Sequence, residues 1–473
     1  MSGFRAANLV RCKPIAAHDP GASDQTGRGL RRTMGVWQLA MLGVGGTIGT
    51  GIFVAFNTAV PEAGPAVIIA FLLAGLTAAL TAFCYAELSS VLPESGSSYS
   101  YAYATLGELA AFMIGACLLL EYTVSGSAVA VGWGQYLNEL MVDFTGHALP
   151  DAIAQPPGHG GYVNLPAVLL VVCCMVLLLR GVRESAAVNV ILVLAKLGVL
   201  ALFAAIAFTV FNVHHLHPFA PKGIGGISSA ASTIFFSYIG LDVVSTAGDE
   251  ARDPQRTLPR GIILALLIVT GAYVVVAVAA VGAQPWTQFA GQDAGLAVIL
   301  RNITGQAWPS EVLSVGAIVS IFSVTLVIIY GQTRILFAMS RDGLLPELFQ
   351  RVNPTTKTPT WNTVIVSGAI ALLAAFVPLD ILTNLTSLGT LAAFAVVSGG
   401  VIILRRTRPD VPRLYKAPFY PVLPAASVVF CLYLIVSLPW ITHLMFLGWL
   451  SAAGLFYFAY SHKRSALALG AAR

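Results

Sequence analysis

Residues 42–53 read Leu-Gly-Val-Gly-Gly-Thr-Ile-Gly-Thr-Gly-Ile-Phe and lie within an apolar segment that runs from about residue 36 to residue 60. That segment is long enough to cross a bilayer as a helix. Each glycine in a helix interior costs roughly 1 kcal/mol relative to alanine. The repeated glycines therefore predict a helix that breaks near Gly49-Thr50-Gly51. The alternative is close helix packing through Gly45 and Gly49, which are four residues apart.

A broken helix at membrane depth has chemical consequences. The break frees backbone N–H and C=O groups, which hydrocarbon tolerates only where they line a cavity inside the protein. The helix that restarts beyond the break has a partial positive charge at its N-terminus, and this charge suits a carboxylate. The break therefore predicts a binding site for a small anionic or zwitterionic ligand.

The composition places the whole chain in a membrane. The 473 residues are 57% hydrophobic and 10% charged, with a mean hydropathy of +0.81, whereas about 25% of residues in a soluble protein are charged. We therefore predict an all-α polytopic membrane protein without an inserted soluble domain. Twelve apolar segments reach spanning length, near residues 36–60, 65–90, 106–137, 164–180, 187–211, 227–248, 260–283, 309–338, 361–378, 382–404, 422–440 and 443–461.

The basic residues predict the topology, because lysine and arginine gather on the cytosolic side. Twelve spans with both termini in the cytosol place 23 of the 26 basic residues there, leaving Lys222 and Arg301 outside and Lys196 within a span. The predicted organisation is a basic cytosolic tail at 1–34, a core at 35–404, and two further helices with a short cytosolic C-terminus at 405–473. The tail contains no apolar stretch of the kind found in a cleavable signal peptide.

Ionisable residues at membrane depth are candidates for function. Lys196 lies near the predicted midplane of the fifth span, where it is either a proton carrier with a lowered pKa or a static ammonium bound to carbonyls of a broken helix. Glu121, which shares a helix face with Ser125, and Asp242 are candidates for proton handling or for structural hydrogen bonds. Glu87, at the inner end of the second span, is expected to be solvated or interfacial.

The sixth span, like the first, is an apolar segment with a predicted break at glycine. The stretch Phe-Phe-Ser-Tyr-Ile-Gly at 235–240 places aromatic residues before a glycine at midplane depth. Two broken spans, five apart in order, indicate an inverted repeat with the substrate site between its halves. The first break offers N–H groups to a carboxylate and both offer carbonyls to an ammonium, so a zwitterion fits. Phe236 is a candidate to cover the substrate, and Ser320 and Ser323 are candidates to line the face opposite Lys196.

Several function classes lack support. We find no phosphate-binding loop after a strand, no zinc pattern and no catalytic triad, so we expect no enzyme activity, no cofactor and no nucleic-acid partner. Histidines in the predicted outer loops allow a metal site, but solvated loop residues are the preferred interpretation, and we assign no metal ligand.

Four stretches resemble the amino acid–polyamine–organocation (APC) transporter superfamily. They are Gly-Gly-Thr-Ile-Gly-Thr-Gly-Ile-Phe at 45–53, Tyr-Ala-Glu-Leu-Ser-Ser at 85–90, Pro-Glu-Ser-Gly-Ser-Ser-Tyr-Ser-Tyr-Ala-Tyr at 93–103 and Phe-Phe-Ser-Tyr-Ile-Gly-Leu-Asp at 235–242. Residues 249–261 and 330–346 look like its cationic amino acid transporter branch, here of the bacterial twelve-helix type. The resemblance implies a five-plus-five inverted-repeat (LeuT-like) core, with repeats at about 35–212 and 226–404, discontinuous helices 1 and 6, and two additional C-terminal helices.

The resemblance also implies where the substrate binds. Around Gly49, the backbone N–H groups of Thr50, Gly51 and Ile52 would meet the substrate carboxylate. Carbonyl groups from both breaks would meet its amine, namely those of Thr47, Ile48, Phe236, Ser237 and Ile239. Lys196 matches a lysine that occupies a sodium position in proton-coupled members, and Glu121 and Asp242 match acidic positions on the proton route.

The expected function is secondary active transport. The first hypothesis is proton-coupled import of amino acids across the plasma (inner) membrane by alternating access, with Lys196 as the proton-linked group. The alternative is an amino acid exchanger on the same fold, in which the lysine is structural. A membrane-embedded enzyme or sensor is the least supported class. The expected partners are the amino acid, the proton and the lipid bilayer, and a small membrane subunit remains open.

Overall fold

The computed structural model describes residues 34–92, 97–181, 186–247, 251–353, 358–465 and 470. These residues form helices joined by short loops, and the described part contains no β-strand beyond one isolated bridge between Met34 and Ala251. The tail predicted at 1–34, except for Met34, lies outside the described residues. So does the end of the sixth predicted span at 248–250.

The helices follow one another along the whole chain. In order, they are α1 (Val36–Thr47), α2 (Thr50–Ala63), α3 (Val67–Val91), α4 (Ser97–Thr105), α5 (Glu108–Thr145), α6 (Asp151–Ala154), α7 (Leu165–Leu179), α8 (Ala186–Thr209), α9 (Gly223–Ile234), α10 (Val243–Thr246), α11 (Pro254–Ala283), α12 (Gly295–Thr304), α13 (Trp308–Arg341), α14 (Thr360–Phe376), α15 (Leu379–Thr407), α16 (Val422–Val436), α17 (Trp440–Phe456) and α18 (His462–Arg464).

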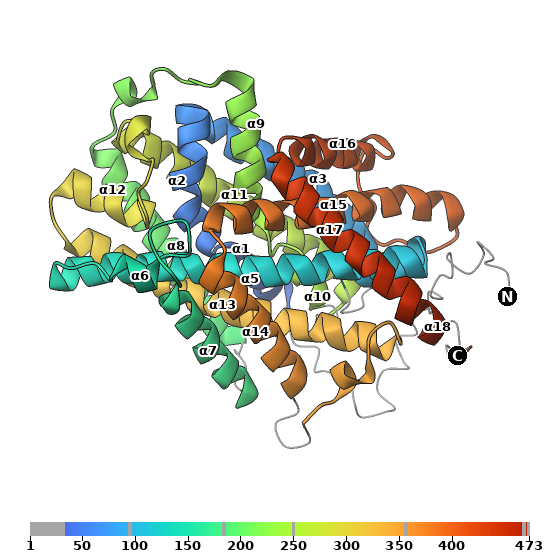
Figure 1. Cartoon of the computed structure of the whole chain (residues 1–473). Helices are drawn as coiled ribbons and strands as arrows, with labels where there is room; N and C mark the ends of the chain where they lie inside the picture. The colour runs from blue at the N-terminus through green and yellow to red at the C-terminus, as the bar shows by residue number, and fades with distance from the viewer. Residues whose placement is uncertain are drawn as a thin grey trace.

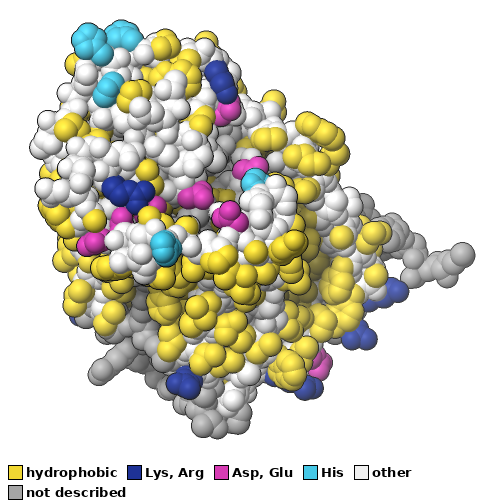
Figure 2. Space-filling view, turned by 60° about the vertical axis from the view of Figure 1, so that its left-hand side comes forward, with side chains coloured by type: hydrophobic (Ala, Val, Ile, Leu, Met, Phe, Trp, Pro, Cys, Tyr) yellow, Lys and Arg dark blue, Asp and Glu magenta, His cyan; other side chains and the backbone are white. Residues whose placement is uncertain are grey.

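Each of the twelve predicted spans coincides with one of these helices or with a broken pair of them. Among the described residues, eight helical stretches are long and apolar enough to cross a bilayer, and shorter apolar helices accompany them at α7, α12, α14 and α16. Exposed apolar side chains cover much of the flank, as expected for a surface in contact with lipid (Figure 2). The predicted all-α polytopic class is confirmed. The count of twelve and the inverted repeat are compatible with this order and remain predictions.

The long helix α5 runs through the middle of the bundle and gives the molecule two ends. Figure 1 shows α6 and α12 at one end of α5 and α18 at the other. We refer to these as the α12 end and the α18 end. Helices α13 and α15 both pack along α5, and α1 packs between α8 and α11. The first broken helix therefore lies deep in the bundle.

The first predicted break is confirmed. Helix α1 ends at Thr47 and α2 begins at Thr50, so Ile48 and Gly49 form the interruption, slightly earlier than predicted. The backbone N–H of Ile48 still donates to Val44 at 2.8 Å. Gly49 then turns back and donates to the Thr47 carbonyl at 2.9 Å. The apolar side chains on both sides are buried, so the interruption lies inside the protein.

The second break is confirmed as well. Helix α9 passes into a 3₁₀ turn, η5 (Phe235–Tyr238), before Ile239 adopts an extended conformation. Gly240 has a φ of 97°, which glycine adopts without strain. A Cβ at Gly240 would also lie 2.5 Å from the Gly46 carbonyl oxygen. Only glycine therefore lets the second break approach α1 this closely.

The expectation for Glu87 was wrong. Its side chain on α3 is 1% exposed and forms a two-pronged ion pair with Arg405 at the end of α15, at 2.5 and 2.7 Å. Arg413 lies 3.6 Å away, and the backbone N–H of Ala417 donates to the same carboxylate at 2.8 Å. These partners are more than 300 residues distant in sequence. Sequence position near a helix end could not reveal them.

Candidate functional site

A cavity lies between the two breaks. Four structural units line it: α1 with α2, the turn from η5 to α10, α5, and α13. Its lining consists of Gly46, Thr47, Gly49, Thr50, Gly51, Glu121, Tyr122, Ser125, Val129, Phe236, Ile239, Gly240, Asp242, Val243, Val324, Val327 and Ile328. The sequence therefore identified the two main walls of this cavity.

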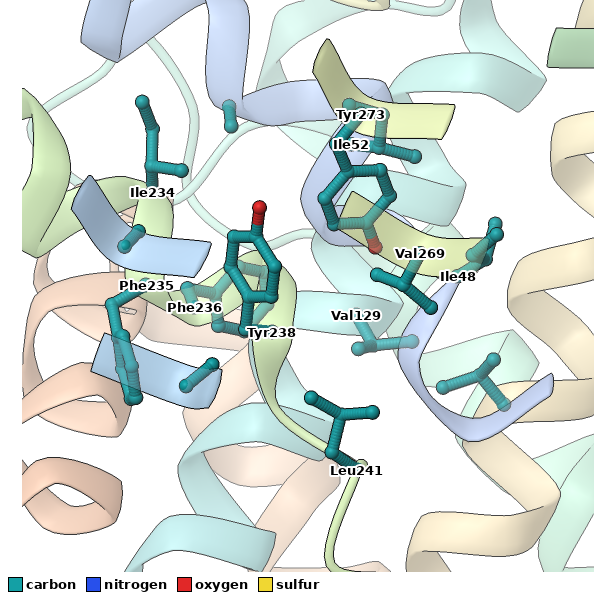
Figure 3. Packing of buried hydrophobic residues seen from close by; sticks show 14 of the residues in the cluster. Ile48, Ile52, Val129, Ile234, Phe235, Phe236, Tyr238, Leu241, Val269 and Tyr273 are labelled. Atoms are coloured by element: carbon teal, nitrogen blue, oxygen red, sulfur yellow. The ribbon is translucent and has the colours of Figure 1, made fainter. Parts of the chain in front are cut away.

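Most of the predicted substrate-contact residues line this cavity. Thr47, Gly49, Thr50 and Gly51 from the first break do so, as do Phe236 and Ile239 from the second. The remaining three, Ile48, Ile52 and Ser237, are buried directly beside it. Figure 3 shows how Ile48 and Ile52 lie in the first broken helix, opposite Phe236 and Tyr238 of the second.

The start of α2 presents its N-terminus to the cavity. The first N–H groups of a helix have no partner within that helix and carry its partial positive charge. The Thr50 hydroxyl donates to the Val129 carbonyl on α5 at 3.2 Å, which fixes this turn against the long helix. The arrangement provides backbone donors suited to an anionic group.

Tyr273 on α11 joins the two breaks, and the sequence reasoning missed it. Its hydroxyl lies 2.8 Å from the Ser237 carbonyl oxygen and 3.0 Å from that of Thr47. The ring packs edge-on against Tyr238, with centroids 5.3 Å apart. Figure 3 shows Tyr273 between the broken segments. A lone tyrosine in an otherwise aliphatic span was the available signal.

Lys196 points into the bundle. Its Nζ atom donates to the Gly45 carbonyl at 2.9 Å, and the residue is 1% exposed. Asn189 lies two turns before Lys196 on α8. A Cβ at Gly45 would lie 2.7 Å from the Oδ1 atom of Asn189. Gly45 therefore allows α8 to approach α1 closely enough for this bond, and the Asn189 amide adds a second one to the Met41 carbonyl at 3.3 Å.

The two predicted carboxylates meet at the cavity. Glu121 on α5 and Asp242 beside α10 both line it and are both buried. Ser125 lines it one turn beyond Glu121, as predicted from their shared helix face. Ser320 and Ser323 are buried on α13 and are not among the residues that line this cavity.

Apart from Tyr122, the remaining side chains of the cavity wall are aliphatic. Val129 on α5 and Val324, Val327 and Ile328 on α13 face it. On the α12 side of the breaks, the Tyr136 hydroxyl donates to the Phe53 carbonyl at 2.8 Å and the two rings pack edge-on, which ties α5 to α2. The lining therefore extends from the breaks toward the α18 end.

Comparisons with known proteins identify the family of this chain. A family model described as amino acid permease matches residues 34–456. The chain is 44% identical to the branched-chain amino acid permease BcaP of Bacillus subtilis (strain 168), covering 93% of this chain and 95% of that protein. It is 42% identical to the methylthioribose transporter of the same organism, covering 98% and 99%.

A plant relative lies in the branch that the motifs indicated. The chain is 37% identical to the vacuolar cationic amino acid transporter 2 of Arabidopsis thaliana, over 85% of this chain and 64% of that one. The resemblance to the APC superfamily is thereby confirmed, as is the expectation of a transporter rather than an enzyme. The chain belongs to the amino acid permease family.

Proposed function

We propose that this protein is a proton-coupled symporter that imports amino acids with aliphatic side chains across the plasma membrane. The observation that carries this proposal is the bond from Lys196 to the Gly45 carbonyl, at the end of the helix that breaks beside the cavity. An ammonium at this place is bound to the same helix whose break would hold the substrate. Protonation and substrate binding therefore act on one structural element.

The two breaks supply complementary groups for a zwitterion. The N–H groups of Thr50, Gly51 and Ile52 would bind the carboxylate, with Gly49 providing the turn before them. Carbonyls of Thr47, Ile48, Phe236, Ser237 and Ile239 would bind the amine. The Thr47 and Ser237 carbonyls already accept from Tyr273. Each carbonyl oxygen has two lone pairs, so the tyrosine positions them and still leaves room for an ammonium.

The substrate side chain would meet the valine and isoleucine wall on α5 and α13. Burying a side chain of this size contributes roughly 1.5–3 kcal/mol, which favours leucine, isoleucine and valine over polar amino acids. The name of the relative BcaP agrees with this preference. The name of the other relative, a methylthioribose transporter, makes that sugar the cargo to test beside them.

The proton would reside on Lys196, and Glu121 with Asp242 would form the route at the cavity. A lysine at the centre of a membrane helix costs about 2.5–3.5 kcal/mol. Its bond to Gly45 offsets part of that cost only while α1 packs against α8. Separation of these helices would remove that bond. We therefore link release of the proton to the movement that opens the site.

The orientation follows from the charges. Arg405 and Arg413 lie at the end of α15 and in the loop that follows it, and Arg334 and Arg341 lie in the last turns of α13. With basic residues on the cytosolic side, the α18 end would face the cytosol, with both termini there.

Uptake into reconstituted liposomes tests the proposal. Leucine uptake into empty vesicles should rise when the outside is made acidic, and Lys196→Ala should abolish this rise while retaining some substrate binding. Lys222→Ala is the matched control, because Lys222 is half exposed and pairs with Glu62 at the surface. Uptake that requires amino acid inside the vesicles would instead identify an exchanger. Unchanged pH-driven uptake by Lys196→Ala would remove the proton role.

A further inference from the structure

Helix α12 lies across one end of the bundle (Figure 1). It packs against α2, α5 and α13, whose inner turns line the cavity, and against α8. Leu296, Ala297, Ile299 and Leu300 on its underside are fully buried. Figure 2 brings this end forward and shows acidic, basic and histidine side chains gathered on it. Helix α12 is therefore placed as a lid over the cavity.

Two polar contacts, which we call straps, hold this lid against α5: one between Gln135 and Asp293, and one from Arg301 to Glu139 and Asp143. Gln135, Glu139 and Asp143 follow one another at intervals of four residues and so share one face of α5. At the start of the lid, the Gln135 amide donates to Asp293 at 2.9 Å. Near its end, Arg301 pairs with Glu139 at 2.6 Å and with Asp143 at 3.1 Å. Asp293 precedes Arg301 by eight residues, and Gln135 precedes Glu139 and Asp143 by four and eight residues.

The two straps differ in chemistry. Arg301 forms ion pairs with two carboxylates. Among the described residues, Asp293 accepts hydrogen bonds from neutral amides, those of Gln135 and, at 3.3 Å, Gln155. Oε1 of Gln135 is buried beside this contact and has no hydrogen-bond partner among the described residues. An orphaned acceptor next to a carboxylate is the group that a carboxylic acid would satisfy.

We propose that Asp293 takes up a proton when the lid α12 closes onto α5, forming a cyclic carboxylic acid–amide pair with Gln135. In this pair, the Gln135 N–H donates to one oxygen of Asp293 and the new O–H of Asp293 donates to Oε1 of Gln135. The proton comes from water on that side of the membrane, and no other bond changes. This deepens the proposed symport, on which its place in the transport cycle rests.

The surroundings of Asp293 give the sign of the effect. Burial raises the pKa of the Asp293 carboxyl, and the nearby Asp151 raises it further, while the Gln155 bond and His159 lower it. Glu139 on α5 is the other acidic group that faces it. A carboxyl with a higher pKa in the closed lid than in an open, solvated lid favours closure when protonated. Closure is therefore strongest in acid and weakens as the pH rises.

This sign fits the direction of import. If the α12 end faces outside, an acidic exterior protonates Asp293 and favours closure of the lid over the occupied site. Loss of the proton at higher pH favours reopening to the same side. The lid would thus add a proton-dependent step on the outside to the one at Lys196.

Thiol labelling of the full chain in detergent tests the lid without requiring transport. The six native cysteines are replaced by alanine, and Ala297→Cys places a reporter under the lid. Ala290→Cys, exposed on the loop before the lid, corrects for the pH dependence of thiol reactivity. The labelling rate of the Ala297→Cys variant, divided by that of the Ala290→Cys variant, should rise at least threefold between pH 5.5 and pH 7.5.

Further variants test whether Asp293 is the group that takes up the proton. Asp293→Asn, which mimics the protonated form, should keep the ratio low at both pH values, and Gln135→Leu should remove the pH dependence too. Glu347→Gln, at an exposed carboxylate in the short helix Glu347–Gln350 away from the lid, should behave like the parent. A threefold rise that persists in Asp293→Asn, or no rise in the parent, would overturn the proposal, and Gln135→Leu decides if Asp293→Asn does not fold. Because no gradient is used, failure of pH-driven uptake leaves this result intact, and the reverse also holds.

Discussion

Gly51 at the start of α2 lies against Ser237 in the second break so closely that a Cβ on Gly51 would be 2.4 Å from the Cα of Ser237. Real side chains do not reach that distance from a backbone atom, so only glycine permits this contact. The two interrupted helices therefore meet backbone to backbone at the cavity. Their exposed N–H and C=O groups lie within reach of one small ligand.

Replacing Gly51 by alanine should separate the two breaks. We expect Gly51→Ala to weaken amino acid binding at least tenfold, because the first N–H groups of α2 would move away from the carbonyls of η5. Equilibrium binding of radiolabelled leucine measures this effect. Gly271→Ala is the control, since Gly271 on α11 has nothing within 4 Å of a new Cβ. Equal affinities of both variants would contradict the assigned site.

Removing the Tyr273 hydroxyl should loosen the same junction. Tyr273→Phe keeps the ring and its contact with Tyr238 but deletes the bonds to the Thr47 and Ser237 carbonyls. The hydroxyl shares its one proton between the two carbonyls, and a hydrogen bond contributes about 1 kcal/mol, so we expect the affinity for leucine to fall about fivefold while the protein stays folded. Tyr162→Phe, at an exposed tyrosine, should change nothing. Wild-type affinity in Tyr273→Phe would show that the hydroxyl does not position the carbonyls.

Val324 should set the size of the accepted side chain. It lines the cavity on α13, and its Cγ2 atom would lie 3.0 Å from a Cβ at Gly49. We expect Val324→Ala to admit phenylalanine and Val324→Met to favour alanine over leucine. Competition of unlabelled amino acids against leucine uptake measures the order of preference. Val319→Ala, exposed on the same helix, is the control. An unchanged order in both Val324 variants would place the side-chain wall elsewhere.

Breaking the Glu87 ion pair should destabilise the α18 end. Glu87→Gln leaves Arg405 and Arg413 without their buried carboxylate, and the loss of one partner of a buried pair costs about 3 kcal/mol. We expect a clear fall in the temperature of thermal unfolding in detergent. Glu347→Gln, at an exposed carboxylate, should leave it unchanged. A Glu87→Gln protein as stable as the parent would mean that solvent replaces the ion pair.

The sequence by itself determined the all-helical membrane class, both interruptions, the burial of Lys196 and the family. These features depend on local physics: hydropathy over about 20 residues, the helix cost of glycine and the cost of charge in lipid. A reader of the chain could place Gly49 and Gly240 at breaks without knowing what they contact.

Only the tertiary structure decided which groups meet. Tyr273 reaches Thr47 from 226 residues away, and Gln135 reaches Asp293 from 158 residues away. Glu87 was expected near water because it lies at a helix end, but the last turn of α15 brings Arg405 to it and the following loop brings Arg413. Hydrogen bonds and ion pairs act over only a few ångströms. Their partners are therefore selected by the packing of whole helices, which no local pattern in the chain records.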